Sequence, residues 1–184
     1  MIILASKSPR RIELMESLGV EFKVEVSEID ESKFTNDDPL VLNQILALEK
    51  AKVIAQYHFN DIVIGSDTIV TLDNKVLGKP KDKEDARKML KQLSGNTHEV
   101  VTSIAIIKND EVYKHTSISK VSFYEINDKE IEDYLNTNEP YDKAGAYAIQ
   151  GEFGKKFIKN INGDYYAIMG FPIANVYHIL KKIM

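Results

Sequence analysis

The fold is decided by MIILASKSPRR (residues 1–11), where an apolar run gives way to hydroxyls and three cations. The pattern predicts a buried strand over residues 2–5. It then predicts a helix that begins at Pro9, because Ser8 stands at the N-cap position and proline is favoured in the first helical turn. A helix N-terminus presents unpaired N–H groups, so this strand, loop and helix predict an anion site to which Ser6 and Ser8 add donors.

Two cations in the first helical turn, Arg10 and Arg11, break a local rule. They lie against the positive end of the helix dipole, at a cost of roughly 0.3–1 kcal/mol each. Local rules are broken most often at functional sites, and a polyphosphate would convert the repulsion into guanidinium and backbone contacts. The alternative is that both arginines point into solvent or pair with Glu13 and Glu16. The Ser-x-Ser-Pro sequence before them favours the phosphate site.

The bulk composition is that of an ordinary globular protein. The chain of 184 residues is 43% hydrophobic and 28% charged, which predicts a single domain over residues 1–184. A net charge of −4 lacks the broad basic surface that duplex nucleic acid requires, so no nucleic-acid partner is expected. Zero cysteines exclude disulfides, thiolate zinc sites and a cysteine nucleophile, and are compatible with a reducing compartment.

The ends and apolar segments of the sequence give no sign of a membrane. The amino terminus has no basic region before a four-residue apolar run, which is not the pattern of a secretory signal. No apolar stretch approaches the length that spans a bilayer. We therefore expect a cytoplasmic protein without a membrane partner.

Acidic residues occur at two places where they are candidates for a functional role. Residues 27–31, Ser-Glu-Ile-Asp-Glu, follow a predicted strand and could hold a divalent cation or form a solvated loop. In residues 61–70, two β-branched runs of the buried-strand type enclose Gly-Ser-Asp-Thr. A buried carboxylate is costly unless it is paired, protonated or bound to metal. Asp67 is therefore either a hydrogen-bond hub or a catalytic or metal-binding acid.

Two lysines are weaker candidates. Lys50 lies on a helix predicted over residues 38–57, where lysines usually only face solvent. Lys79 lies in Gly78-Lys79-Pro80, a rigid loop from which its ammonium could reach a phosphate, although an idle lysine in a turn is the plainer reading.

The remaining pattern mixes helices with isolated strands and hairpins. A long hairpin is predicted over residues 100–124, and another over residues 157–169 before a closing helix that begins at Pro172. Between them, residues 139–151 predict a loop and a short strand that delivers Gln150 to a pocket. The mixture predicts an α/β protein with a mixed sheet, in two lobes around a cleft.

Taken together, the motifs of this chain resemble the Maf family, nucleoside triphosphate pyrophosphatases once called septum formation proteins. The motifs stand in the family's order and cover nearly the whole chain, and as a set they are highly specific. One mild departure is Phe171, where many members have leucine. The matching pieces are Leu4–Arg11, Asp30-Glu31, Glu49-Lys50-Ala51, Ser66-Asp67-Thr68, Gly78-Lys79-Pro80, Leu93-Ser94-Gly95 with His98, Asp142–Tyr147 with Ile149-Gln150-Gly151, and Gly170-Phe171-Pro172.

The resemblance implies an elongated mixed sheet with flanking helices and a cleft, related in fold to inosine triphosphate pyrophosphatases (Ham1). It implies a nucleoside triphosphate diphosphatase that hydrolyses dTTP and UTP, or a modified pyrimidine triphosphate, to the monophosphate and pyrophosphate. The cofactor would be a divalent cation, Mg²⁺, Mn²⁺ or Co²⁺. Such an enzyme would remove unwanted nucleotides before polymerases use them.

The resemblance also assigns roles residue by residue. Asp67 matches the family's proton acceptor, and Ser8, Arg11, Glu31, Lys50 and Lys79 match its other polar active-site positions. Arg10, Thr68 and Gln150 match the positions that sort subfamilies by base, and resemble the dTTP/UTP branch. The resulting expectation is a catalytic set, a substrate-binding set and a metal pair: Asp67, Lys79, Lys50 and Arg11; Ser6, Ser8, Arg10, Arg11, Thr68 and Gln150; Glu31 and Asp67.

Two readings compete with the enzyme. The family's older name suggests a nucleotide-binding regulator of cell division without turnover, in which the same polar residues would sense a ligand. Single-stranded nucleic-acid binding through the arginines and tyrosines is weaker, because the net charge is negative. The sequence leaves the oligomeric state open, a homodimer included.

Overall fold

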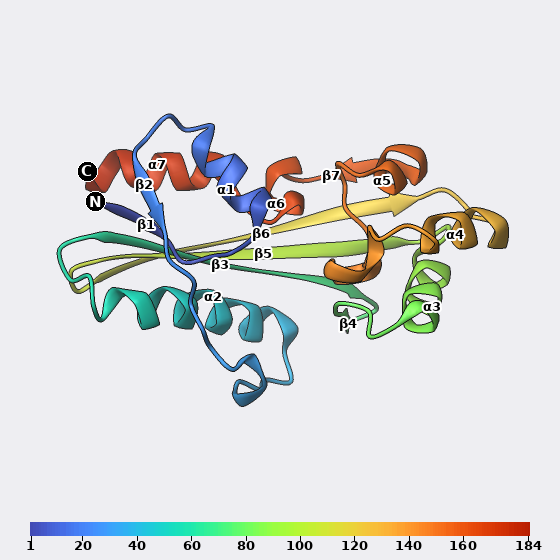
Figure 1. The fold of residues 1–184 in the computed structure, drawn as a ribbon, viewed down its shortest axis with the longest axis horizontal. Coiled ribbons are helices and arrows are strands. Elements are labelled where there is room, and N and C mark those ends of the chain that lie inside the picture. Colours follow the sequence, from blue (N-terminus) through green and yellow to red (C-terminus); the bar gives the residue numbers. More distant parts are fainter. The chain divides into compact units, whose positions relative to one another are not determined.

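A computed structural model describes all of the chain, Met1–Met184, as an α/β protein built on one mixed sheet (Figure 1). The seven strands follow the order β2-β1-β3-β5-β6-β7, with β4 paired to β3 off this path. β1 is parallel to both β2 and β3, whereas the β3–β4 and β6–β7 pairs are antiparallel. The strands are β1 (Ile2–Leu4), β2 (Phe22–Val24), β3 (Ile62–Leu72), β4 (Lys75–Leu77), β5 (Thr97–Lys108), β6 (Glu111–Phe123) and β7 (Ile158–Asn162).

Helices are interspersed among the strands along the chain, and most begin where the sequence predicts. Pro9 and Pro39 occupy first-turn positions, and Asn127 with Glu130 forms a complete capping box. None of the helices has the length and apolar character needed to cross a membrane. The helices are α1 (Pro9–Glu16), α2 (Pro39–Ala55), α3 (Lys83–Leu93), α4 (Asp128–Leu135), α5 (Glu152–Phe157), α6 (Tyr165–Met169) and α7 (Ile173–Ile183), with 3-10 turns η1 (Glu31–Lys33), η2 (Pro140–Asp142) and η3 (Ala144–Ala146).

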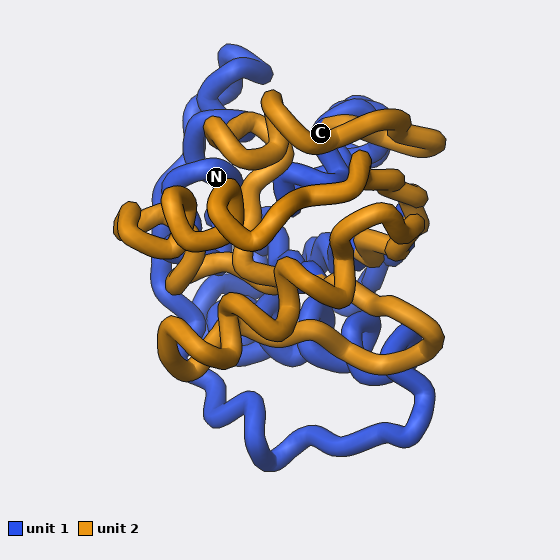
Figure 2. Tube along the Cα trace, turned by 90° about the vertical axis from the view of Figure 1, so that its right-hand side faces the viewer, with its two compact units in different colours: residues 1–68, 102–117, 166–184 blue, residues 69–101, 118–165 orange.

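The chain divides into two compact units, which Figure 2 colours separately. Strands β3, β5 and β6 each pass from one unit into the other. The α/β class and the mixed sheet with flanking helices are confirmed, whereas the expected cleft stays a prediction. Unit 1 is Met1–Thr68, Thr102–Ser117 and Tyr166–Met184, and unit 2 is Ile69–Val101 and Ile118–Tyr165.

Within unit 1, α2 covers one face of the strands, and α1 and α7 cover the other (Figure 1). Small and β-branched residues of α2, β3, β5 and the segment through β1 to Ala5 pack together on the α2 face, which allows helix and sheet to approach closely. The resulting cluster comprises Ile3, Ala5, Ala51, Ile54, Val63, Ala105 and Ile107.

Within unit 2, the core is aromatic. Phe123 contacts the rings of His98, Tyr147 and Phe153 edge to face, with centroids 4.9–5.8 Å apart. His98 is buried, and its Nε2 lies 2.7 Å from the Tyr147 hydroxyl. Burial lowers the pKa of His98 to about 4 and raises the pKa of Tyr147.

Two predicted strands are wrong. Residues 165–169 form helix α6 instead of a hairpin strand, because Gly170 N and Phe171 N donate to carbonyls one turn back, at Ala167 and Tyr166. The segment before Gln150 is not a strand either. Gly145 and Ala146 both have positive φ, 69° and 63°, so the chain turns there.

Candidate active site

The register of β1 on β3 sets the position of the loop that the sequence singles out. Leu4 pairs with Ile64, and Ala5 N donates to Ile64 O at 2.8 Å. β1 then ends, whereas β3 continues through Asp67. The loop over residues 5–8 therefore leaves the sheet beside Asp67, and α1 starts immediately after it.

Ser8 occupies the N-cap position of α1, as predicted. Its backbone is extended, with φ −69° and ψ 118°, but its hydroxyl makes no capping hydrogen bond. Ser8 N instead donates to Ser6 Oγ at 3.2 Å. Pro9 has no N–H, and Arg11 N and Ile12 N both donate to Ser8 O at 3.1 Å, so the N–H of Arg10 is the one in the first turn left for an anion.

Arg11 donates its hydrogen bonds to the protein's own oxygens. Its Nε donates to Gly170 O at 2.8 Å, and its Nη1 donates to Ser66 O at 2.9 Å and to Ser6 Oγ at 3.4 Å. Its Nη2 donates to Thr68 Oγ1 at 3.1 Å. A guanidinium has five N–H groups, so these four bonds leave one for a ligand. Burial lowers the pKa of Arg11, and the nearby Asp67 carboxylate opposes that shift.

The two arginines therefore differ. The reading in which both face solvent or pair with neighbouring glutamates is wrong for Arg11, because its partners are carbonyls and hydroxyls of other segments. Arg10, at the start of α1, is half-buried, and its side chain makes no hydrogen bond or ion pair within the protein. Arg10 is thus the first-turn cation that remains available to an arriving anion.

Thr68 belongs to a chain of hydroxyls. Its Oγ1 lies 3.0 Å from Thr102 Oγ1, and Thr102 donates to Ala167 O at 2.7 Å. Because Thr102 uses its proton on Ala167, Thr68 must donate to Thr102 and accept from Arg11. One acceptor lone pair and the methyl group of Thr68 remain for a ligand.

Asp67 and Glu31 converge on one ammonium group. Lys50 Nζ lies 2.6 Å from Asp67 Oδ1 and 2.8 Å from Glu31 Oε1. The side chains of Lys50 and Asp67 are 13% and 10% exposed, whereas Glu31, at the start of η1, is 56% exposed. Lys50 is therefore not an idle surface lysine: it is the counter-ion of the buried acid.

Gly65 explains how α2 brings Lys50 so close. A Cβ on Gly65 would lie 2.3 Å from Ala47 O and 2.7 Å from Ala51 N, so the backbone of α2 rests directly on β3. Any side chain at Gly65 would separate helix from strand. The sequence reading did not assign this role to Gly65, although a glycine inside a β-branched run is itself a signal of close backbone approach.

The same helix face carries a residue that the sequence reading missed. Asn43 is fully buried and donates from Nδ2 to Asp67 Oδ2 at 2.8 Å. Both oxygens of Asp67 thus have a donor from α2, one from Asn43 and one from Lys50.

The metal pair expected from the sequence is present as two carboxylates. The structure contains no group of three or more histidine, aspartate or glutamate side chains arranged to hold a metal ion. The donor set that does converge, oxygens of Glu31 and Asp67, is of the hard type that Mg²⁺ and Mn²⁺ prefer. The residues thus fit a divalent cation that takes its other ligands from elsewhere.

Two expected site residues, Lys79 and Gln150, belong to unit 2. Lys79 is exposed in the segment between β4 and α3. Gln150 is half-buried, and its Oε1 is buried without a hydrogen-bond partner. Glu139 Oε1 is in the same condition and lies against Gly151, where a Cβ would come within 1.8 Å of it.

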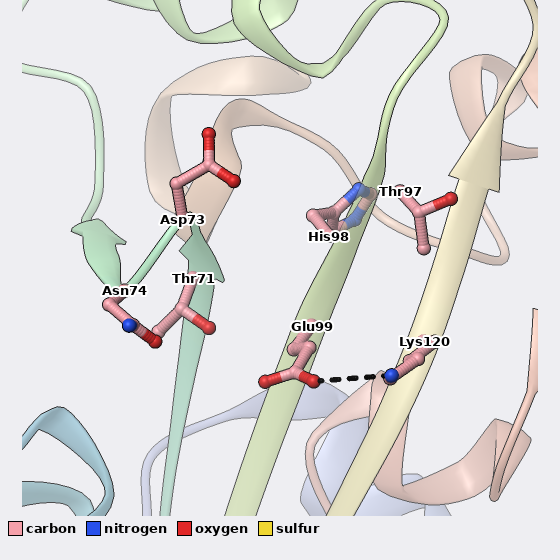
Figure 3. Close-up of a pocket in the computed structure, with 7 residues that line it drawn as sticks. All are labelled: Thr71, Asp73, Asn74, Thr97, His98, Glu99 and Lys120. Atoms are coloured by element: carbon pink, nitrogen blue, oxygen red, sulfur yellow. Dashed lines mark ion pairs between the residues drawn. The ribbon is translucent and has the colours of Figure 1, made fainter.

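Unit 2 also has a polar hollow of about 350 Å³, drawn in Figure 3. Glu99 and Lys120 face each other there at 3.9 Å. None of the residues predicted to form the active site lines it. The lining residues are Thr71, Asp73, Asn74, Thr97, His98, Glu99 and Lys120.

A family model described as "Maf-like protein" matches residues 1–183. The chain belongs to the Maf family. A relative from Bacillus cytotoxicus named dTTP/UTP pyrophosphatase is 46% identical over 180 residues, covering 98% of this Maf chain and 94% of its own. A relative of the same name from Clostridioides difficile is 48% identical over 183 residues, with the same coverage. A solved structure of the Staphylococcus aureus Ham1 protein matches 84% of this chain and 89% of its own, with 18% identity and a TM-score of 0.43.

Membership of the Maf family confirms the resemblance drawn from the sequence motifs. Eight of the ten expected site residues lie in unit 1 of this Maf protein. They are linked by hydrogen bonds, by ion pairs or by being neighbours in the sequence. They are Ser6, Ser8, Arg10, Arg11, Glu31, Lys50, Asp67 and Thr68.

Proposed function

We propose that this Maf protein hydrolyses dTTP and UTP to the nucleoside monophosphate and pyrophosphate. The relatives named dTTP/UTP pyrophosphatase support the reaction, because they are 46% and 48% identical over nearly the full length. One structural observation supports the assignment of this reaction to the site around Asp67. Asp67 is a buried carboxylate whose two oxygens accept from Lys50 and Asn43.

The chemistry requires a base and neutralisation of phosphate charge. Asp67 accepts a proton from a water molecule as the water oxygen forms a bond to the α-phosphorus. The bond between that phosphorus and the bridging oxygen breaks, and pyrophosphate leaves. A triphosphate carries about four negative charges, which the guanidinium and the backbone N–H of Arg10 at the start of α1 partly offset.

A divalent cation would be held by Glu31 and Asp67. Mg²⁺ commonly binds through one or two carboxylates together with substrate phosphates, so the two-carboxylate set suits a cation that arrives with the nucleotide. When bound, it would neutralise charge on the phosphates and the leaving pyrophosphate. Lys50, which contacts both carboxylates, would then adjust its contacts to make room.

Selectivity for uracil and thymine would come from Gln150. Its buried Oε1 lacks a donor, and the ring N3–H of uracil or thymine supplies one, whereas cytosine has no proton at N3. A site with an unmet acceptor discriminates strongly against a base that cannot satisfy it.

The function is tested by pyrophosphate release from dTTP, UTP, CTP, dGTP, 7-methyl-GTP and a modified pyrimidine triphosphate. Each is assayed with Mg²⁺, with Mn²⁺ and with chelator. We expect metal-dependent release from dTTP and UTP that Asp67→Asn abolishes and the control Asp73→Asn, in the β3–β4 turn, retains. Binding of dTTP without release from any nucleotide would overturn the enzyme in favour of a nucleotide-binding regulator.

The base assignment has its own test. Gln150→Glu keeps an acceptor oxygen but loses the amide donor, and its carboxylate can accept from the amino group of cytosine. We expect the ratio of kcat/KM for UTP over CTP to fall by about tenfold or more. An unchanged ratio would remove Gln150 from base recognition and leave the phosphate chemistry intact.

A further inference from the structure

Asn43 is a buried amide in a place where the packing calls for an apolar side chain. It lies on the face of α2 that also buries Leu46, Ala47, Ala51 and Ile54. Its side chain is fully buried, and its Oδ1 has no hydrogen-bond partner. A buried acceptor without a donor costs free energy, so stability alone does not explain an asparagine here.

The other half of the amide has one strong contact. Nδ2 donates to Asp67 Oδ2 at 2.8 Å, across the close packing of α2 on β3 at Gly65. Asn43 and Lys50 are seven residues apart, two helical turns, so they project from the same face of α2. Lys50 holds Oδ1 at 2.6 Å while Asn43 holds Oδ2, and the carboxylate of Asp67 is fixed between them.

The orientation of the amide follows from this contact. Reversing it would direct Oδ1 at a carboxylate oxygen and replace an attraction by a repulsion. Oδ1 of Asn43 therefore lacks a donor because the N–H of the same amide is needed at Asp67. Hydrogen bonds from N–H groups to carboxylates are stronger than those between neutral groups, and they fix the direction of the acceptor.

We propose that Asn43 is a positioning residue, which orients the Asp67 carboxylate for proton transfer in the reaction proposed above. Asn43 does not touch the nucleotide: it acts through Asp67. Preorganised geometry of this kind is required most in the transition state, so its loss lowers kcat more than it weakens substrate binding.

Three variants of Asn43 separate this role from a packing role. Asn43→Leu has a similar branched shape and no donor, Asn43→Asp is isosteric and presents an acceptor to Asp67, and Asn43→His keeps an N–H at the same number of bonds from Cα. Gln44→Leu, on the exposed neighbour, is the matched control. Thermal unfolding of every variant reports whether the fold is retained.

With UTP, we expect Asn43→Leu and Asn43→Asp to lower kcat by about 30-fold or more while KM stays within about twofold. Asn43→His, where folded, recovers part of kcat, and Gln44→Leu changes neither constant. Wild-type kcat in folded Asn43→Leu and Asn43→Asp would overturn the proposal.

A readout without turnover distinguishes failure of this inference from failure of the proposed function. The Asn43 side-chain amide protons are followed by NMR in the wild type, Asp67→Asn and Glu31→Gln. We expect one proton to be shifted downfield and protected from exchange in the wild type and in Glu31→Gln, and to lose both features in Asp67→Asn. Absence of that signature in the wild type would refute the contact, whether or not the protein releases pyrophosphate.

Discussion

Arg11 Nε donates to the carbonyl oxygen of Gly170 at 2.8 Å, although 159 residues separate the two along the chain. Ser66 Oγ donates to the same carbonyl at 3.1 Å. Gly170 has φ 114°, a conformation that L side chains rarely adopt, so the carbonyl is presented by a backbone that requires glycine. Arg11 therefore joins the start of α1, the middle of β3 and the segment before α7 into one frame around the candidate site.

This frame predicts that Arg11→Lys destabilises the protein. A lysine ammonium cannot reproduce the planar fork that reaches Gly170, Ser66 and Thr68 together, so buried oxygens are left without donors. We expect the free energy of unfolding in urea to fall by roughly 2 kcal/mol. Arg10→Lys, at a half-buried position without a hydrogen-bond partner, is the matched control and should leave the free energy of unfolding within about 0.5 kcal/mol. Equal stability of the two variants would show that Arg11 does not hold the frame.

Arg10 is expected to act on the substrate instead. Arg10→Ala removes a half-buried cation at the N-terminus of α1 and leaves the frame of Arg11 intact. We expect KM for UTP to rise by about tenfold in steady-state kinetics, with a smaller change in kcat, because a charge-assisted phosphate contact is lost. Arg10→Lys should recover most of the loss. A KM unchanged in Arg10→Ala would mean that the anion is bound without this residue.

Gly65→Ala is predicted to impair both stability and turnover. The added Cβ would meet the backbone of Ala47 at 2.3 Å, so α2 must move away from β3. Overpacking of this kind costs about 1–3 kcal/mol. A displacement near 1 Å would also carry Lys50 and Asn43 away from Asp67 and lower kcat by about 100-fold. Gly78→Ala, which meets nothing within 4 Å, is the control for stability in the same denaturation series.

His98 is predicted to make stability depend on pH. Burial lowers its pKa from 6.5 to about 4, so between those values the unfolded chain binds the proton and the folded chain does not. The stabilisation is complete above pH 6.5 and is lost as the pH falls towards 4. From pH 7 to pH 5, the wild type should lose about 2 kcal/mol more than His98→Gln, which keeps a neutral partner for Tyr147. Parallel pH profiles in urea denaturation would contradict this origin.

Much of this architecture follows from local sequence signals. Ser8 and Pro9 mark the start of α1, the strand alternation marks the long β5–β6 hairpin, and the family motifs name the site residues. The two wrong strand predictions fall beside glycines with positive φ, Gly145 and Gly170. The segment over residues 165–169 looks like a strand, yet its backbone groups bond within a turn that the glycine at 170 closes.

The spacing of residues in the sequence does not show which side chains of the site touch one another. The helix over residues 39–55 is apolar on nearly all sides, so its pattern does not reveal which face Asn43 occupies. The structure buries the face that carries Asn43, Leu46, Ala47, Ala51 and Ile54. The orientation of the helix is set by the contact at Gly65, which joins residues distant in the chain.

The central claim is that water attacks the α-phosphorus of UTP with Asp67 as the proton acceptor. The most direct measurement is hydrolysis of UTP in ¹⁸O-labelled water, with mass spectrometry of both products. We predict one ¹⁸O in UMP and none in pyrophosphate for the wild type and for Asp73→Asn, and no turnover above background for folded Asp67→Asn. Label in pyrophosphate, or wild-type turnover by Asp67→Asn, would contradict the account.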